Sequence, residues 1–182
     1  LITTRGFKDV LEIGRAYRKE NIYDIQMESP EPLVKRNLRF EISGRMNFQG
    51  KETEPLKLEE IPAIVEELRA KNIKSVGICL MHSYANPEHE QKVKKALKKA
   101  WPEGYVSASS DINPQFREYE RLCGTVLNSF VGPEVKKYMN NLKKTLESIG
   151  IHSTYINHSN GGLMSIDESM KFPVKTALSG PA

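Results

Sequence analysis

Residues 75–110, "SVGICLMHSYANPEHEQKVKKALKKAWPEGYVSASS", carry the strand–helix–strand pattern that decides the fold class. The opening "SVGICLMH" is a nearly continuous apolar run, which is typical of a buried strand. Asn86 then predicts the N-cap of a helix and Pro87 its first position. Glu88 and Glu90 follow in the first turn, where the helix dipole favours acidic side chains. The closing "GYVSASS" predicts a second short strand.

The same alternation continues towards the N-terminus. "LITT" predicts the end of a strand, followed by a turn at Gly6 and a helix that starts near Phe7. Residues 38–48 predict an extended segment with a bulge at Gly44. The helix expected over residues 58–72 has an apolar face made of Ile61, Ile64, Val65 and Leu68. This order of elements predicts an α/β fold, with a mostly parallel sheet and flanking helices.

The second half of the chain predicts two consecutive helices and a further strand. The first helix begins near residue 116, and its predicted buried stripe consists of Phe116, Tyr119, Cys123, Val126, Leu127 and Phe130. Gly132 and Pro133 are expected to end it, and a second helix then runs to Gly150. "HSTYIN" predicts a strand, "HSNGG" a loop and "SIDESMKF" a short helix.

The charge and the apolar runs of the sequence indicate which kinds of binding partner to expect. The 27 Lys and Arg residues against 23 Asp and Glu residues give a net charge of +4, and the excess lies mostly in residues 92–100 and 134–144. Both segments have helical spacing, so their lysines predict a solvated helix face, with an acidic partner as the alternative. No aromatic residues interleave with them as on a nucleic-acid platform, so nucleic acid is not an expected partner. No apolar run reaches the roughly 18 residues of a membrane span, so the sequence predicts no membrane partner.

The two cysteines, Cys79 and Cys123, lie far apart in apolar surroundings. They match neither a disulfide framework nor a zinc pattern, and a reducing, cytoplasmic compartment is the expectation. The chain opens without Met and stops at "SGPA", so we expect it to be a piece of a longer protein.

Polar, turn-rich sequence follows three predicted strands, at residues 81–90, 109–121 and 157–165. Ligands of open α/β sheets bind outside the carboxyl ends of the strands. If the strands are parallel, all three segments share one rim of the sheet. The second segment holds the charge cluster, which we define as Arg117, Glu118, Glu120 and Arg121.

The charge cluster has two readings. Arg117 and Arg121 would clamp a carboxylate or phosphate in a planar, bidentate way. Alternatively, they pair with the neighbouring glutamates at helical spacing and form a solvated first turn. Asp111, on the same segment, is either a further site residue or a turn residue.

Two other candidates have weaker patterns. His82 and His89 flank a strand-to-helix turn, but no third ligand stands at a recognised spacing, so packing or capping is favoured and no metal is predicted. Asn160, Gly161 and Gly162 would let the backbone approach a phosphate, with a simple turn as the alternative.

Four stretches resemble one family. They are "LITTRGFKDVLEIGR", "CLMHSYANPEHE", "SSDINPQFREYERLCGTVLNSFVGP" and "SNGGLMSIDESMKFPVKTALSGPA", and together they cover nearly the whole chain. They resemble the hydantoinase A/5-oxoprolinase family, which includes the ATP-dependent N-methylhydantoinases and a subunit of acetone carboxylase. The resemblance implies an actin/sugar-kinase-like (ribonuclease H-like) ATPase several times longer than this chain.

The resemblance also implies an activity. The complete protein would use ATP with Mg to open a lactam or imide ring of the 5-oxoproline or hydantoin type, together with a hydantoinase B-type subunit or fused half. The alternatives are an acetone-carboxylase-like subunit, or a non-catalytic assembly domain for the hydantoinase B-type partner.

The resemblance further assigns parts of the chain. Residues 1–130 would end the family's N-terminal domain, and residues 131–182 would begin the hydantoinase A domain. Candidates for the nucleotide side are Asn160, Gly161, Gly162, Ser179 and Gly180. The main phosphate loops are expected outside residues 1–182, so the chain alone is expected to be inactive. Arg117, Glu118 and Arg121 would form the crevice or its hinge, and charge reversal at Arg121 would abolish activity with the fold intact.

Overall fold

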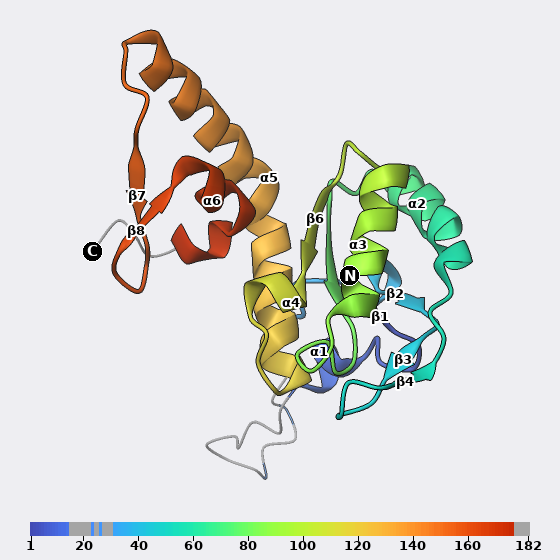
Figure 1. Ribbon diagram of the computed structural model, residues 1–182. Coiled ribbons are helices and arrows are strands. Elements are labelled where there is room, and N and C mark those ends of the chain that lie inside the picture. The colour runs from blue at the N-terminus through green and yellow to red at the C-terminus, as the bar shows by residue number, and fades with distance from the viewer. Residues whose placement is uncertain (15–22, 24–25, 27–30, 177–182) are drawn as a thin grey trace.

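A four-stranded parallel sheet forms the centre of the structure (Figure 1). The computed structural model describes residues 1–14, 23, 26 and 31–176. The strands are β1 (Ile2–Thr4), β2 (Phe40–Ile42), β5 (Ser75–Cys79) and β6 (Tyr105–Ala108). Their order is β2-β1-β5-β6, and every neighbouring pair is parallel. The predicted α/β class with a mostly parallel sheet is therefore confirmed.

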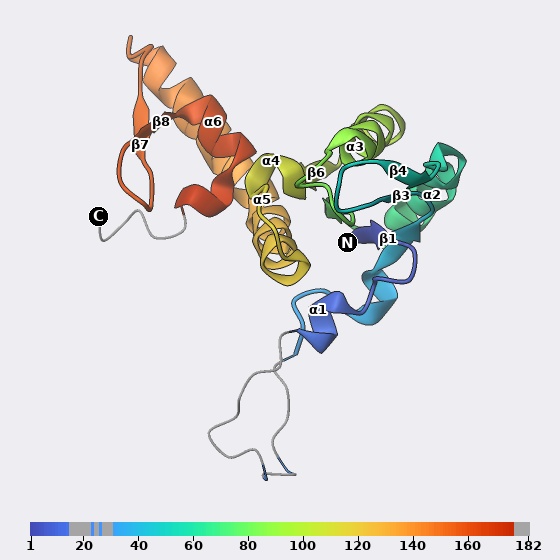
Figure 2. The same cartoon turned by 60° about the horizontal axis from the view of Figure 1, so that its bottom comes forward.

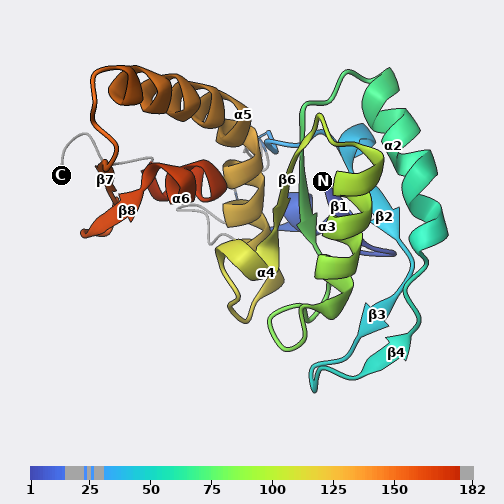
Figure 3. The ribbon, with the colours of Figure 1, turned by 45° about the horizontal axis from the view of Figure 1, so that its top comes forward.

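Helices cover both faces of this sheet, as Figure 3 shows. α2 (Ile61–Ala70) and α3 (Glu88–Ala100) lie on one face, and α5 (Glu118–Ser148) crosses the other. The alternation of side chains along β5 serves both layers, because Ile78 joins the core under α2 and α3 whereas Cys79 packs with Leu122 and Val126 of α5. The predicted apolar face of α2 is buried throughout.

A small hairpin interrupts the predicted extended segment 38–48. β3 (Arg45–Met46) pairs antiparallel with β4 (Glu52–Glu54). Gly44, with φ of 129°, separates β2 from β3, and a Cβ at this position would lie 2.7 Å from the Leu56 Cα. The glycine predicted to mark a bulge thus lies between two strands, where two backbone segments approach closely.

Short helices complete the first half of the chain. They are α1 (Val10–Ile13), η1 (Arg36–Leu38), η2 (Leu58–Glu60) and α4 (Ser109–Ile112). The helix predicted from Phe7 starts later in the structure, because α1 begins at Val10 after a turn region, and it ends at Ile13 with Gly14 as its C-cap. The predicted start of α3 is one residue too early, because Pro87 and not Asn86 occupies the N-cap and α3 starts at Glu88. The Asn86 side chain still accepts a bond of 3.0 Å from the Glu88 N–H.

The break predicted at Gly132 and Pro133 is wrong, because α5 runs through both residues. An internal proline removes one backbone hydrogen bond and costs about 3 kcal/mol. Packing offsets this cost: α5 packs against β5 and β6 and also against α6 and η3. The proposed domain boundary at residues 130 and 131 lies within this helix.

The buried stripe predicted for α5 is wrong at three of its six residues, although Val126 is buried as predicted. Phe116, Leu127 and Phe130 are exposed by 66%, 41% and 67%. The buried side of α5 instead consists of Arg121, Leu122, Thr125, Val126, Asn128, Ser129, Gly132 and Met139. Small polar residues suit this side because α5 passes close to β5 at Gly77, and the hydroxyls of Thr125 and Ser129 donate to helix carbonyls four residues back.

The C-terminal segment forms a separate hairpin and helix beside the second half of α5 (Figure 2). β7 (Tyr155–Asn157) was predicted as a strand, and it pairs antiparallel with β8 (Leu163–Ser165). The sequence did not predict β8 or this pairing. α6 (Ile166–Lys171) follows as predicted, capped by the Ser165 hydroxyl, and η3 (Pro173–Thr176) ends the described chain. Residues 157–165 therefore do not share the rim of the parallel sheet, and that part of the rim prediction is wrong.

Candidate functional site

The carboxyl ends of β1, β5 and β6 meet at one edge, and the polar segments 81–90 and 109–121 lie there as predicted. The Met81 N–H, just past β5, donates to the Thr4 hydroxyl at the end of β1 over 3.0 Å. Parallel pairing explains this convergence, because all three strands run in the same direction.

Glu90 is fully buried beneath this edge. Its carboxylate accepts bonds from the Leu80 N–H at 2.8 Å, the Ser109 hydroxyl at 2.6 Å and the Ser110 N–H at 2.8 Å. Glu90 lies in the first turn of α3 as predicted, but its side chain is buried and serves the network at the sheet edge. The missed signal is its spacing, because Glu90 shares the helical stripe of the buried Val93 and Leu97.

Arg121 is also fully buried, and it completes the same network. Its Nε donates to Ser109 Oγ at 3.0 Å and its terminal nitrogens donate to the carbonyls of Leu80 at 2.7 Å and Gln115 at 3.3 Å. Since the one proton of Ser109 goes to Glu90, the Ser83 hydroxyl, 3.1 Å away, donates to Ser109. Arg121 therefore holds the sheet edge together, and charge reversal there is not expected to leave the fold intact.

The other members of the charge cluster border a crevice of about 280 Å³. Its walls are Phe7, Val10, Gly14, Met81, Arg117, Glu118, Tyr119 and Glu120. We call this the rim crevice. It lies between the β1–α1 turn and the first turn of α5, so the cluster is not merely a solvated helix start.

Arg117 occupies an unusual backbone conformation directly before α5. Its φ of 88° and ψ of 113° lie in a region that favours glycine. Such strain costs on the order of 1–3 kcal/mol and collects at functional sites. The anchoring of the next turn through Arg121 holds the chain in this conformation.

The two histidines do not form a metal site. His89 Nε2 lies 2.7 Å from Glu52 Oε1 of β4, whereas His82 makes an edge contact with the Tyr84 ring. His82 has φ of 56°, and its buried Nδ1 has no hydrogen-bond partner among the described residues. Within residues 1–14, 23, 26 and 31–176, no group of three or more His, Cys, Asp or Glu is placed to hold a metal ion.

Asp111 stands apart from the rim crevice. Its carboxylate accepts bonds from Gln91 at 2.9 Å and from Lys94 at 2.5 Å, both on α3. The structure thus ties Asp111 to α3 and does not bring it to Arg117 and Glu118.

Asn160, Gly161 and Gly162 form the exposed turn of the β7–β8 hairpin. The amides of Asn160 and Gly161 donate to His158 itself, to Nδ1 at 3.0 Å and to the carbonyl at 2.9 Å. A phosphate cradle needs amides that point together at the ligand. The described loop therefore does not fit a nucleotide phosphate. Ser179 and Gly180 lie outside the described residues.

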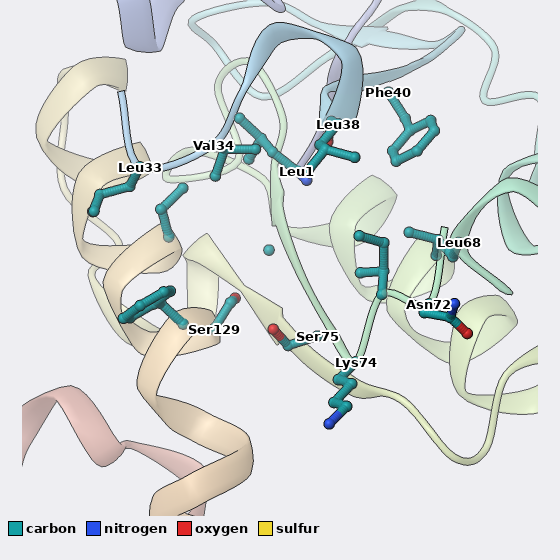
Figure 4. Close-up of a pocket in the computed structure, with 14 residues that line it drawn as sticks. Leu1, Leu33, Val34, Leu38, Phe40, Leu68, Asn72, Lys74, Ser75 and Ser129 are labelled. Atoms are coloured by element: carbon teal, nitrogen blue, oxygen red, sulfur yellow. The ribbon is translucent and has the colours of Figure 1, made fainter. Parts of the chain in front are cut away.

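A second cavity, of about 260 Å³, lies at the opposite, amino edge of the sheet (Figure 4). Leu38, Phe40 and Leu68 line it together with Ser75 and with Ser129 of α5. Its walls are mainly apolar, so it offers packing surface.

In the described part of the chain, no helix combines the length and the apolar character needed to cross a membrane.

Two protein-family models match this chain. Residues 1–101 match the hydantoinase/oxoprolinase N-terminal region, and residues 121–182 match the hydantoinase/oxoprolinase model. The whole chain aligns with caprolactamase subunit alpha of Pseudomonas jessenii at 32% identity and with 5-oxoprolinase of Saccharomyces cerevisiae at 28%, covering 26% and 16% of those proteins.

Solved structures agree with the sequence matches. The crystal structure of ATP-dependent caprolactamase from Pseudomonas jessenii superposes with a TM-score of 0.88 at 31% identity, over 99% of this chain and 26% of that one. Nucleotide-free acetone carboxylase superposes with a TM-score of 0.83 at 25% identity, over 99% and 27%. The chain thus spans about a quarter of the length of these solved structures.

Proposed function

Because this chain belongs to the hydantoinase/oxoprolinase family, we propose that it forms part of an ATP-dependent enzyme that opens a cyclic amide, of the 5-oxoproline or hydantoin type. The observation that carries this proposal is the alignment of the whole chain with part of the relatives named caprolactamase and 5-oxoprolinase. Both names specify a lactam substrate. The complete enzyme would use Mg-ATP and work with a hydantoinase B-type subunit or fused half, in the cytoplasm.

ATP would supply the energy that activates the poorly electrophilic amide. The described loop at residues 158–162 does not fit a phosphate, so nucleotide binding is assigned to the complete protein and not to this loop. The chain is proposed to supply the last part of the N-terminal domain, residues 1–130, and the start of the hydantoinase A domain, residues 131–182.

The rim crevice is the proposed functional surface of this chain. Arg117 and Glu118 line it, and the fully buried Arg121 holds the turn that carries them. We assign substrate or domain-interface contacts to Arg117 and Glu118, and a positioning role to Arg121. A cationic and an anionic group side by side suit the acceptor and donor atoms of a ring amide.

Carboxylation is the second candidate. The superposition on acetone carboxylase and the 25% identity to the acetophenone carboxylase gamma subunit of Aromatoleum aromaticum support it. A third possibility is a non-catalytic domain that assembles with the hydantoinase B-type partner.

The test is ADP release by the full-length protein with its B-type partner. Substrates would be 5-oxoproline, hydantoin, caprolactam, and acetone with bicarbonate. Stimulation by one cyclic amide supports the hydrolase. Stimulation only by acetone with bicarbonate selects carboxylation, and ATP binding without stimulation by any of them rejects both reactions.

Site variants would test the rim crevice separately. Glu118→Gln is expected to lower stimulated turnover about tenfold, the loss of one charge-assisted contact. Glu134→Gln is the matched control, since Glu134 lies on the same helix and does not line the crevice. Equal turnover in both variants would remove the crevice from the mechanism.

A further inference from the structure

A groove of about 830 Å³ lies between α3, the edge strand β6, the second half of α5 and α6. Figure 3 shows α3 on one side of β6 and α5 with α6 on the other. The groove shares no lining residue with the rim crevice. It is therefore a separate surface of the described chain.

Lysines from three helices converge on this groove. Lys94 and Lys98 come from α3, Lys136 from α5 and Lys171 from α6. The sequence predicted a solvated lysine face on residues 92–100 and another on residues 134–144, with an acidic partner as the alternative. The fold brings both faces to one groove, which we call the lysine groove.

The carboxylates in the lysine groove do not neutralise it. Asp111 is bonded to Lys94 at 2.5 Å, and Asp167 is bonded to Lys143 at 2.9 Å, a lysine outside the lining. Lys98, Lys136 and Lys171 have no carboxylate within ion-pair distance in the part of the chain that the structure describes. Three ammonium groups thus remain for a ligand.

Burial and, after it, neighbouring positive charges both act on the pKa of Lys98. Partial burial lowers the pKa of Lys98, and the charge of Lys94 lowers it further. Lys136 and Lys171 add to the effect, and Asp111 opposes it. A bound anion would relieve the mutual repulsion of these groups.

We propose that the lysine groove binds a small anion that carries at least two negative charges on phosphate or carboxylate groups. The volume falls within the range of small-molecule sites, about 300–1,000 Å³. Three donors on three separate helices can surround such an anion. Phe172 and Met170 give the groove an apolar wall for the body of the ligand.

Titration calorimetry of the full-length protein with pyrophosphate and with citrate tests the proposal and separates phosphate from carboxylate ligands. The double variant Lys98→Gln/Lys136→Gln is expected to weaken binding about tenfold or more. The matched control is Lys95→Gln/Lys137→Gln, which removes two lysines of the same helices outside the lining. Its affinity is expected to change less than about twofold.

Three results would overturn the proposal. The first is absence of binding by either anion, and the second is an equal loss of affinity in the two double variants. The third is displacement of the anion by Mg-ATP together with loss of ATP binding in the groove variant, since the groove would then belong to the nucleotide site. None of these three results bears on the proposed ring-opening reaction, which the ADP-release assay tests separately.

Discussion

The Nε of Arg121 donates to Ser109 Oγ over 3.0 Å and joins the first turn of α5 to the first residue of α4, directly after β6. The Ser109 hydroxyl in turn donates a hydrogen bond of 2.6 Å to the Glu90 carboxylate. One hydroxyl therefore links a buried cation to a buried anion. Charges buried in this way are tolerated only when hydrogen bonds satisfy them. The rim crevice therefore sits on a rigid base.

Arg121→Met should destabilise the protein strongly, because it removes three hydrogen bonds and leaves Glu90 without its nearby cation. We expect the free energy of unfolding in urea to fall by about 3 kcal/mol or more. Arg117→Lys, at an exposed position, should change it by less than about 1 kcal/mol. A loss below about 1 kcal/mol for Arg121→Met would show that the network does not hold the edge.

Two glycines of α5 make a matched pair. A Cβ at Gly132 would overlap the Tyr105 ring, whose hydroxyl is held by the carbonyls of Met170 and Lys171, whereas a Cβ at Gly124 meets nothing within 4 Å. Gly132→Ala should lower the free energy of unfolding by about 1–3 kcal/mol through overpacking. Gly124→Ala should raise it by about 0.5–1 kcal/mol through helix propensity. Thermal melts with the same sign of change for both variants would contradict this packing.

Arg117→Gly should release backbone strain. Glycine adopts φ near 88° without a Cβ clash, so the free energy of unfolding should rise by about 1 kcal/mol while turnover of the complete enzyme falls. Asn72→Gly is the comparison, since asparagine tolerates its φ of 52° and the gain should be only a few tenths of a kcal/mol. A destabilised Arg117→Gly variant would mean that side-chain contacts outweigh the strain.

The buried thiol of Cys79 should lower the free energy of unfolding at high pH. Burial, with the charge of Glu90 adding to it, raises the pKa of the thiol from 9.0 to about 12, although Arg121 partly opposes the shift. The folded state therefore keeps the thiol protonated after the unfolded chain has ionised. This stabilising contribution is complete below about pH 9 and is lost as the pH rises towards about 12.

The comparison of wild type with Cys79→Ala isolates this effect. Between about pH 8 and about pH 10.5, the free energy of unfolding should fall by about 2 kcal/mol more in the wild type than in the variant. Parallel pH profiles for the two proteins would show that the thiol is not protected from ionisation.

Local sequence patterns determined the type and order of most elements. The apolar run at β5 and the stripe of Ile61, Ile64, Val65 and Leu68 depend on neighbours a few residues away, and the structure confirms them. The parallel sheet follows from that order, because a strand–helix–strand unit returns the chain in the same direction. The charge cluster was also visible, and Arg117, Glu118 and Glu120 do border the rim crevice.

Only the tertiary structure decided which charged residues face inwards. Glu90 and Arg121 are buried because their partners, Ser109 and Leu80, arrive from other elements 10 to 41 residues away. The continuity of α5 through Pro133, the hairpin at residues 155–165 and the convergence of lysines from three helices have the same origin. The periodicity of apolar residues shows which side of a helix or strand faces the core. The free energy of burying a charged side chain depends instead on hydrogen-bond donors and acceptors that only the folded chain brings close to it.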